Sequence, residues 1–301
     1  MKRMFENSIR GGMSFCNVHI ATASNPYVGN NMEHKMSLMY VDENNLYGNA
    51  LCMKLPVSDF VQCSEIPLID WRNVDTEGDI GYLLEVDLDY PMSIHNATES
   101  FPLAPENMEI TNEMLTPLMK RQLSAMHMAR HERDVPMLPT RKLVASCRDK
   151  KNYVVHFKVL KFYLRKGMII SKIHTVISFQ QYAIYKNYID FNTDCRSKAT
   201  NDFTKTFYKQ INCSLFGKSM EDVRNRLKIH LVGDPQEYRR LAGKPNFIGT
   251  IILDQDLVML QMTNDNVKLK STIAIGAAVL DLSKLVMYEL VMISCQCMSE
   301  H

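Results

Sequence analysis

Asp42 is the residue whose type and position first suggest chemistry in this chain. It follows an alternating segment, residues 36–41, that predicts a short strand, and it precedes a turn and a predicted short helix over residues 46–53. A carboxylate at a strand end stands on a rigid element and can face a cleft, where it could hold a divalent cation. Asp is also a favoured helix cap. Metal ligand and helix cap are therefore both open interpretations of Asp42.

A second candidate is a basic helix that the apolar spacing predicts over about residues 193–219. The residues that lie four apart and form its predicted buried stripe are Ala199, Phe203, Phe207, Ile211 and Leu215. Lys205 and Lys209 are one turn apart on another face, so their ammonium groups can point the same way. Fixed cations of this kind suit a polyphosphate leaving group, on which negative charge grows as a bond breaks.

Residues 141–181 form a basic segment with interleaved aromatic residues. Phe157, Leu160 and Leu164 predict an amphipathic helix over residues 152–166, which Gly167 would end. This spacing assigns the aromatic residues to a core. Charge elsewhere on the segment suits DNA phosphates, whose contacts set register without reading sequence. The lysines that we assign to backbone binding are Lys150, Lys151, Lys158 and Lys161.

The clearest strand signal is the alternation of residues 80–89, which stops before Pro91. Its outward carboxylates Glu85, Asp87 and Asp89 are interpreted as a solvated face rather than as metal ligands, because they alternate with apolar residues. Short apolar strands are also predicted near residues 247–253 and 257–262, followed by a buried helix over residues 274–292.

Length and composition bound the class of protein. The 301 residues are 46% hydrophobic and 23% charged, which is enough for one large or two ordinary domains with real cores. The eight cysteines have no framework spacing and no secretory signal precedes them, so an intracellular, reducing compartment is expected. No run approaches about 18 uninterrupted apolar residues, so we expect no membrane partner.

The net charge of +2 hides a strong polarity along the chain. Residues 42–115 hold fifteen Asp and Glu against two Lys and Arg, whereas residues 141–172 hold ten basic residues against one acidic residue. Residues 196–244 add eleven basic residues against five acidic ones. A basic half suits a polyanion and an acidic half suits divalent cations. A charge-segregated structural protein is the alternative.

Two motifs carry a family resemblance. Residues 40–50, with Asp42, Asn45, Leu46, Tyr47 and Gly48, resemble motif A of the B-family DNA polymerases, Asp-x-x-Ser-Leu-Tyr-Pro. Residues 209–218 resemble motif B, Lys-x-x-x-Asn-Ser-x-Tyr-Gly, and follow in the right order. The form of motif A is similar to that of the protein-primed branch, and within it to the polymerases of Polinton/Maverick-type mobile elements.

The resemblance implies an α+β fold, a partial polymerase right hand with an antiparallel-sheet palm and a helical fingers element. The expected units are an N-terminal segment over residues 1–35, a palm with a basic insertion over 36–188, fingers over 189–230 and the remaining palm over 231–301. The thumb and the exonuclease are expected to be absent. The partners that the resemblance implies are template and primer DNA, a dNTP and a terminal priming protein, whereas the oligomeric state and the choice between nucleus and cytoplasm stay open.

The resemblance also implies roles for particular residues. Asp42 and the Glu43 carbonyl would bind Mg²⁺ or Mn²⁺, and Tyr47 would stack under the sugar and exclude a 2′-hydroxyl. The residues expected to bind nucleotide beside Tyr47 are Arg196, Lys198, Lys209, Ser214, Phe216 and Gly217. An element similar to Tyr-x-Gly-Gly, with Ile9 in place of the Tyr, would bring Arg10, Gly11 and Gly12 to DNA.

Departures from the family pattern bear on activity. Cys213 replaces the usual Asn of motif B, and a thiol is a poor hydrogen-bond partner. Residues 278–285 match a phrase that precedes motif C in the family, but the Asp-Thr-Asp of motif C does not follow before His301. One aspartate cannot hold the two ions of nucleotidyl transfer without a carboxylate partner. The sequence therefore predicts a polymerase fragment that is incomplete or inactive, with a non-catalytic DNA- or nucleotide-binding remnant as the alternative.

Overall fold

The computed structural model describes residues 1–14, 20–25, 27, 37–38, 40, 42–122, 141–264, 266–267 and 272–299, with side chains described up to residue 291. Its described part is a mixed α+β fold with antiparallel sheets, as predicted. The main sheet has the order β1-β6-β2-β5, and every neighbouring pair is antiparallel. Its strands are β1 (Leu55–Gln62), β2 (Ile80–Asp89), β5 (Lys150–His156) and β6 (Ile169–Tyr182).

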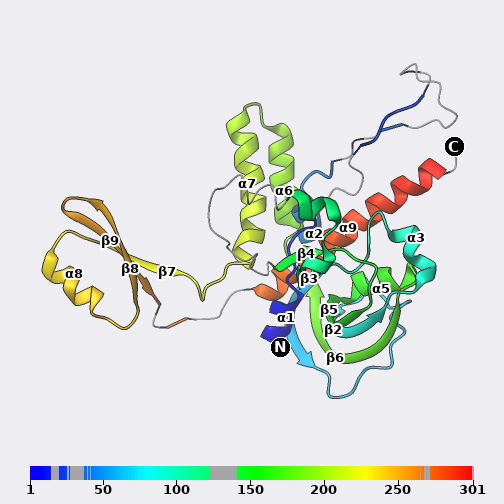
Figure 1. The fold of residues 1–301 in the computed structure, drawn as a ribbon, viewed down its shortest axis with the longest axis horizontal. Helices are drawn as coiled ribbons and strands as arrows, with labels where there is room; N and C mark the ends of the chain where they lie inside the picture. The colour runs from blue at the N-terminus through cyan, green and yellow to red at the C-terminus, as the bar shows by residue number, and fades with distance from the viewer. Residues whose placement is uncertain are drawn as a thin grey trace.

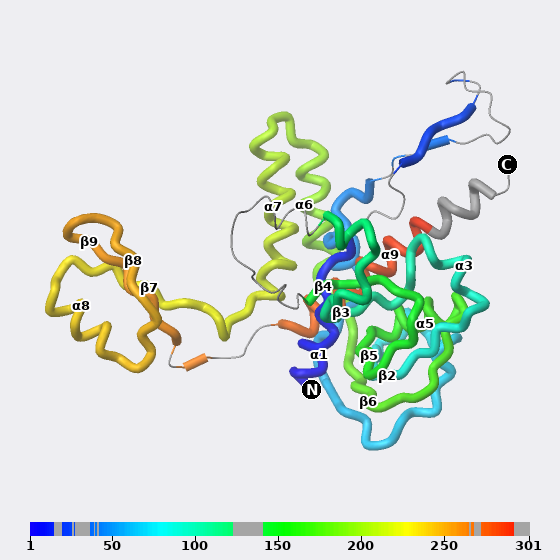
Figure 2. Tube along the Cα trace, viewed as in Figure 1, coloured from blue at the N-terminus to red at the C-terminus, as the bar shows by residue number. Residues whose placement is uncertain are grey.

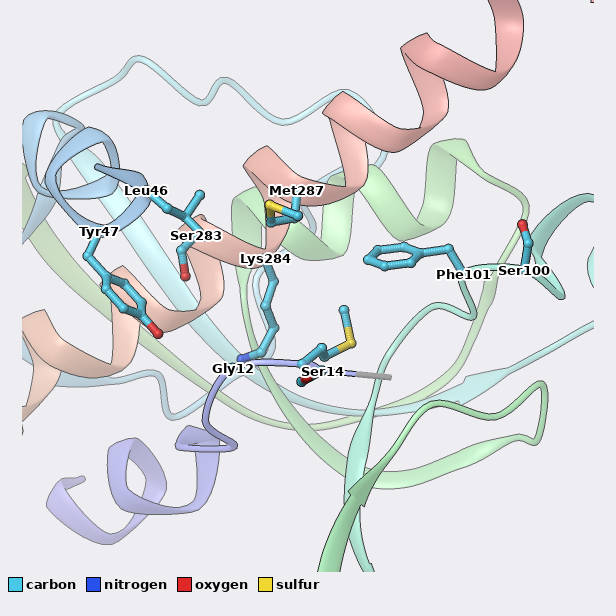
Figure 3. A pocket seen from close by; sticks show the side chains of 10 residues that line it. Gly12, Ser14, Leu46, Tyr47, Ser100, Phe101, Ser283, Lys284 and Met287 are labelled. Atoms are coloured by element: carbon cyan, nitrogen blue, oxygen red, sulfur yellow. The ribbon is translucent and has the colours of Figure 1, made fainter. Parts of the chain in front are cut away.

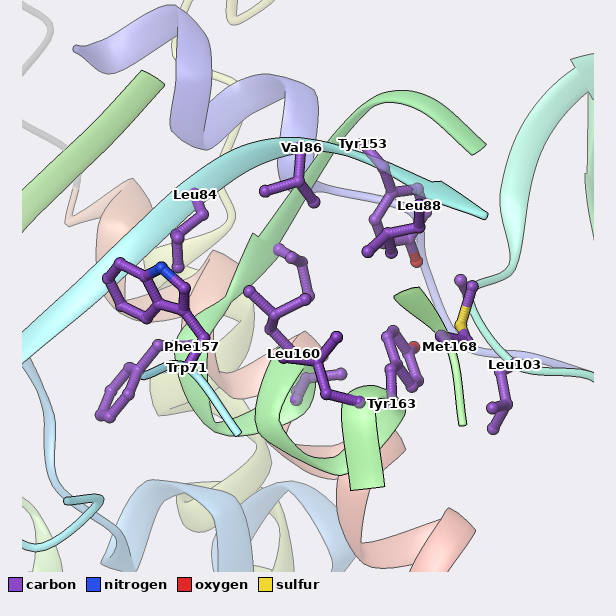
Figure 4. Packing of buried hydrophobic residues seen from close by; sticks show 14 of the residues in the cluster. Trp71, Leu84, Val86, Leu88, Leu103, Tyr153, Phe157, Leu160, Tyr163 and Met168 are labelled. Carbon is purple, nitrogen blue, oxygen red and sulfur yellow. The ribbon is translucent and has the colours of Figure 1, made fainter. Parts of the chain in front are cut away.

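Strand β2 has the bounds that its alternation predicted. Leu84, Val86 and Leu88 are fully buried on one face, and Leu84 lies opposite Val155 of β5 and Val176 of β6. Helix α5 (Phe157–Arg165) covers this face and contributes buried Phe157, Leu160, Tyr163 and Leu164 to the same core (Figure 4). The aromatic residues of this segment are therefore core residues, as the sequence indicated, and Gly167 ends the helix with φ of 103°.

Three short helical elements and a small ribbon accompany the sheet. The ribbon consists of β3 (Glu106–Glu109) and β4 (Arg141–Val144), which pair antiparallel. The helical elements are η1 (Met92–Ile94), α3 (His95–Thr98) and η2 (Asn112–Met114). The loop over residues 99–105 lies between α3 and β3, and its buried Leu103 joins the core under α5.

Helix α9 (Ile273–Ser299) organises the body of the molecule. It packs against α1 (Lys2–Ser8), α2 (Leu46–Cys52), α5, β1 and β5 (Figure 1). Its Ala277 joins Phe5, Leu83 and Phe179 in the core on the second face of the sheet. The predicted apolar helix over residues 274–292 is thus confirmed, and no helix within the described ranges is long and apolar enough to cross a membrane.

A helical pair rises from the sheet, formed by α6 (Lys186–Lys198) and α7 (Asp202–Ser219), which pack along each other (Figure 1). The sequence had predicted one helix over residues 193–219. The chain turns at residues 199–201 because the Asn201 side chain accepts a hydrogen bond from the Thr204 N–H at 2.8 Å and caps a new helix. The predicted apolar stripe is wrong at its start, since Phe203 is 80% exposed and Phe207 is 48% exposed.

A separate lobe projects from the body on the side away from α5 (Figures 1 and 2). It contains a sheet of order β7-β9-β8 with strands β7 (Leu227–Val232), β8 (Phe247–Asp254) and β9 (Leu257–Thr263). Helix α8 (Pro235–Ala242) covers one face through a core of its own, formed by Val232, Leu241, Leu260 and Met262. The strands predicted near residues 247–253 and 257–262 are confirmed by β8 and β9.

Two further expectations differ from the structure. Residues 152–156 belong to strand β5 instead of the predicted helix over 152–166, because Val154 and Val155 pair with Glu85 and Leu84 of β2. The strand predicted over residues 36–41 lies partly outside the described residues. Its described members Ser37, Leu38 and Tyr40 carry no strand pairing, and Tyr40 is 92% exposed.

Candidate functional site

The turn before α2 places Asp42 and Glu43. Asn45 adopts a left-handed conformation with φ of 62° and ψ of 47°, and α2 then starts at Leu46 without a side-chain cap. Asp42 therefore does not cap this helix, and its exposed carboxylate has no hydrogen-bond or ion-pair partner among the described residues. Glu43 Oε1 accepts a long hydrogen bond of 3.4 Å from Asn49 Nδ2. Of the two interpretations left open by the sequence, the cap is excluded.

Tyr47 joins the two segments that the motifs single out. Its ring stacks on the ring of Phe216, with centroids 4.3 Å apart and an angle of 10° between the planes. Such stacked pairs contribute about 1 kcal/mol beyond the area they bury. Tyr47 and Phe216 border a core that includes Leu51 of α2, Ile189 of α6 and Val279 of α9. The motif A-like turn and the motif B-like helix are therefore held together by α9 and α6.

A pocket of about 470 Å³ opens on the other side of Tyr47 (Figure 3). Its lining brings together four stretches of chain: the Gly-Gly segment, the start of α2, the loop after α3 and the middle of α9. A Cβ added to Gly12 would lie 3.5 Å from the Tyr47 hydroxyl, so the Gly-Gly segment lies directly beside that ring. The lining residues are Gly12, Met13, Ser14, Leu46, Tyr47, Ser100, Phe101, Ser283, Lys284 and Met287.

Helix α7 presents the cationic candidates. Lys209 is exposed and has no ion-pair or side-chain hydrogen-bond partner within the described part of the chain. It lies seven residues before Phe216, which places both on nearly the same helix face about 10 Å apart. A buried hydrogen bond of 3.0 Å from Asn192 Nδ2 to Asn212 Oδ1 fixes α7 against α6. Lys209 and the Tyr47–Phe216 pair thus lie on the same face of α7.

The other residues predicted to bind nucleotide on α6 and α7 differ in their exposure and in their contacts. Lys198 pairs with Asp194 at 2.9 Å on the exposed surface of α6, and Arg196 is half-buried on the same helix. The Ser214 hydroxyl is exposed and donates to the Ile211 carbonyl at 2.8 Å. Gly217 is exposed, and an added Cβ there would meet no atom within 4 Å.

The lysines assigned to DNA binding are engaged within the protein. Lys150 is fully buried and donates to Glu106 Oε1 at 2.8 Å, and Lys158 is 8% exposed and donates to Glu77 Oε1 at 3.1 Å. Lys161 donates to the Val74 carbonyl at 2.6 Å, and Lys151 lies 3.7 Å from Asp87. Lys150 and Lys158 have no exposed ammonium for a phosphate, so their assignment to DNA binding is corrected to structural ion pairs.

Three of these contacts join the acidic and the basic segments of the sequence. The acidic segment 42–115 and the basic segment 141–172 pair with each other across β2, β5 and α5. Asp87 shows the pattern best, because it accepts hydrogen bonds from the Asn152 N–H and, at 2.9 Å, from His174 Nε2. These bonds hold the pKa of the Asp87 carboxyl below its usual value. The Asp87 side chain is thus 13% exposed and held by protein contacts, so at this residue the predicted solvated face is wrong.

Arg10 is placed by the body of the protein. It is 9% exposed, its guanidinium lies 3.7 Å over the ring of Tyr153, and it donates to the Val154 carbonyl at 2.6 Å. The predicted DNA contact through Arg10 is thus replaced by a structural one. Gly11 has φ of 73°, which favours glycine, and it lets the chain bend so that Gly12 faces the pocket.

The donors for a divalent cation are few. The described residues contain no group of three or more His, Cys, Asp or Glu placed to hold a metal ion. The free carboxylate of Asp42 suits one Mg²⁺, which keeps several waters and is usually completed by substrate phosphates. The donor set of the described residues does not fit a two-ion centre.

Sequence reasoning missed the part of the pocket that α9 supplies. Lys284 and Ser283 line it, although the sequence showed only a charge within an apolar helix. A signal was nevertheless present. A lysine flanked by apolar residues on a buried helix requires a partner or a polar cavity, because an unpaired buried charge is costly.

Comparisons with known proteins add one structural likeness. No protein-family model and no characterised protein sequence matches the chain. Among solved structures, the chain is similar to phi29 DNA polymerase in its orthorhombic crystal form, with 12% identity and a TM-score of 0.39 over 80% of this chain and 33% of that one. It is also similar to the same polymerase with primer-template DNA, with 12% identity, a TM-score of 0.40 and coverage of 80% and 32%.

The ternary complex of phi29 DNA polymerase with primer-template DNA and incoming nucleotide gives 13% identity and a TM-score of 0.38, over 79% of this chain and 32% of the polymerase. The chain spans about a third of the length of these polymerases. At these TM-scores the likeness is too loose to assign palm or fingers to individual elements.

Proposed function

We propose that this chain is part of a protein-primed B-family DNA polymerase and binds a deoxynucleoside triphosphate and DNA. The observation that carries the proposal is the stack of Tyr47 on Phe216, which joins the motif A-like turn to the motif B-like helix. In this proposal the main sheet is the palm and α6 with α7 is the fingers element. An origin in a Polinton/Maverick-type element, an intracellular location and a terminal priming protein belong to the same proposal.

The proposal gives each residue a task. In this proposal the sugar of a nucleotide lies in the pocket against Tyr47, and the Tyr47 ring, which stands beside Gly12, excludes a 2′-hydroxyl. Lys209, about 10 Å away along α7, reaches the phosphates, since a triphosphate extends over a comparable distance. The open space over Gly217 accepts the edge of a base pair. Asp42 binds one cation that the phosphates complete.

The steric role of Tyr47 predicts a change in sugar selectivity. We expect Tyr47→Val to reduce discrimination between dATP and ATP by about tenfold, because the removed ring no longer excludes the 2′-hydroxyl. Competition binding with a fluorescent dATP analogue measures this ratio. Tyr185→Val is the matched control, since Tyr185 packs on the same core without lining the pocket. Equal effects of the two substitutions would contradict the role of Tyr47.

Catalysis is tested separately on a primed template with labelled nucleotide. Extension that is lost in Asp42→Asn supports nucleotidyl transfer at this carboxylate, whereas extension that survives the substitution excludes it. Among the described residues, no three or more His, Cys, Asp or Glu are grouped to hold a metal ion, which favours a second candidate, a non-catalytic protein that binds nucleotide and DNA. That candidate predicts dATP binding without extension in both proteins.

A substitution at Gly217 should change stability and ligand affinity in opposite directions. We expect Gly217→Ala to raise the free energy of unfolding by about 0.5–1 kcal/mol, because alanine favours a helix and the added Cβ meets open space. The affinity for dATP should nevertheless fall severalfold, since the methyl group occupies the space for the base pair. Urea unfolding measures the first effect, and dATP titration in the presence of primer-template DNA measures the second. Gly276→Ala is the contrasting variant, whose Cβ would lie 2.4 Å from Met220 Sδ and should destabilise the protein.

A further inference from the structure

Lys284 is a buried cation at the wall of the pocket. It lies in the middle of α9, its side chain is 5% exposed, and its stem runs from the helix toward Gly12, to one side of Tyr47 (Figure 3). Its single ion-pair partner in the described structure is Asp281, at a long 3.4 Å. An ammonium group has three donors. Lys284 therefore lines a mainly apolar pocket with hydrogen-bonding capacity to spare.

The buried charges around Lys284 do not balance. Asp281 is 3% exposed, and its second oxygen already accepts the His156 N–H at 3.1 Å. Arg10, buried nearby, adds a second positive charge and contacts only carbonyl groups and the Tyr153 ring in the described part of the chain. His156 adds no charge, because burial lowers its pKa to about 3. Two cations thus face one carboxylate.

The pKa of Lys284 is lowered in this environment. Burial lowers the pKa of Lys284, Asp281 raises it, and the charge on Arg10 lowers it further. A buried positive excess beside a pocket is stabilised when an anion enters, because the desolvation cost of the charges has already been met by folding. The ligand that this pocket favours is therefore anionic.

We propose that the pocket between Gly12, Tyr47 and Lys284 binds a phosphate group, with Lys284 as the cation that holds it. The proposal rests on the proposed function, since Tyr47 contributes to both. The phosphate belongs either to a free nucleotide or to a DNA strand that passes the Gly-Gly segment. A pocket of about 470 Å³ accepts a group of this size in both cases.

The test compares Lys284→Met with wild type in two separate titrations with Mg²⁺ present, one with a fluorescent dATP analogue and one with end-labelled primer-template DNA. We expect at least about a tenfold loss of affinity for one of the two ligands, because a charge-assisted hydrogen bond to phosphate is removed. A loss for dATP alone identifies the nucleotide phosphate, and a loss for DNA alone identifies the strand phosphate. Lys244→Met is the matched control, an exposed lysine without an ion pair in the described structure.

Lys284→Met leaves Asp281 without its lysine and could unfold the protein. The double variant Asp281→Asn/Lys284→Met keeps the net charge of the buried group and should fold, as circular dichroism would show, while it still lacks the ammonium. Unchanged affinity for both ligands in the folded double variant overturns the proposal. Wild-type protein that binds neither ligand overturns the proposed function instead, so the two failures are distinguishable.

Discussion

A His156→Phe variant is expected to lose much of the acid sensitivity of this protein. The His156 side chain is 1% exposed, and neither ring nitrogen has a hydrogen-bond partner in the described structure. Burial, and to a lesser extent the nearby Lys158, lowers its pKa from 6.5 to about 3. The unfolded chain therefore binds a proton between these values that the folded chain does not.

The lowered pKa of His156 makes the protein less stable at acid pH. The stability that neutral His156 contributes is fully present above its unfolded pKa of about 6.5 and is lost as the pH falls toward 3, by about 1.4 kcal/mol per pH unit. Phenylalanine does not titrate and packs between Phe157 and Phe179, whose ring centroids lie 4.9 Å and 6.0 Å from that of His156. Between pH 6.5 and 4.5, the free energy of unfolding of the variant should rise by about 2–3 kcal/mol relative to that of wild type.

Urea unfolding of both proteins across this pH range measures the difference and cancels the shared titration of carboxylates. His230→Gln on β7 is the control, because His230 lies in the separate lobe and is not fully buried. A difference between wild type and His156→Phe that stays constant with pH would show that His156 titrates normally in the folded state.

The second large effect is expected at Lys150. Its fully buried ammonium donates to Glu106 Oε1 at 2.8 Å, to Ser146 Oγ at 2.9 Å and to the Ser146 carbonyl at 3.2 Å. Lys150→Met retains much of the packing but leaves these acceptors unpaired, so the free energy of unfolding should fall by about 3 kcal/mol. Chemical unfolding followed by the single tryptophan reports this loss, because Trp71 lies in the adjacent core.

The neighbouring residue supplies the control. Lys151 has a 63% exposed side chain and lies 3.7 Å from Asp87, so Lys151→Met should cost less than about 1 kcal/mol. The assignment of Lys150 to the protein interior fails if the two variants have equal stability. It also fails if Lys150→Met is stable and instead reduces the salt dependence of DNA binding by about one charge.

Local patterns predicted those elements whose ends are marked in the sequence. Alternation and Pro91 defined β2, and the apolar length of α9 was enough to place it in the interior. The patterns failed where tertiary contacts decide. Residues 152–156 fit a helical spacing as well as a strand, and pairing with β2 selects the strand. The break between α6 and α7 depends on a single capping side chain, Asn201.

The site was predictable in its parts but not in its assembly. Sequence patterns selected Tyr47 and Phe216 separately, and their stacking depends on how α9 packs the two segments together. The excess of basic residues led to the assignment of Lys150 and Lys158 to phosphate binding. That assignment was wrong because a count of charges does not show which carboxylate each lysine meets. Lys284 was not predicted as a site residue because the cavity beside it is formed by four stretches that are distant in the sequence.

The packing of α9 also sets the order in which this protein can fold during synthesis. Of the four core clusters within the described residues, three contain α9 residues: Tyr288 in the core under α5, Ala277 on the second face of the sheet, and Val279 beside α2. None of these cores is complete until the ribosome has released α9. The lobe core, formed within residues 232–262, is complete earlier. A nascent chain therefore carries a folded lobe while the main sheet still exposes apolar surface, which is the stage at which it most needs a chaperone.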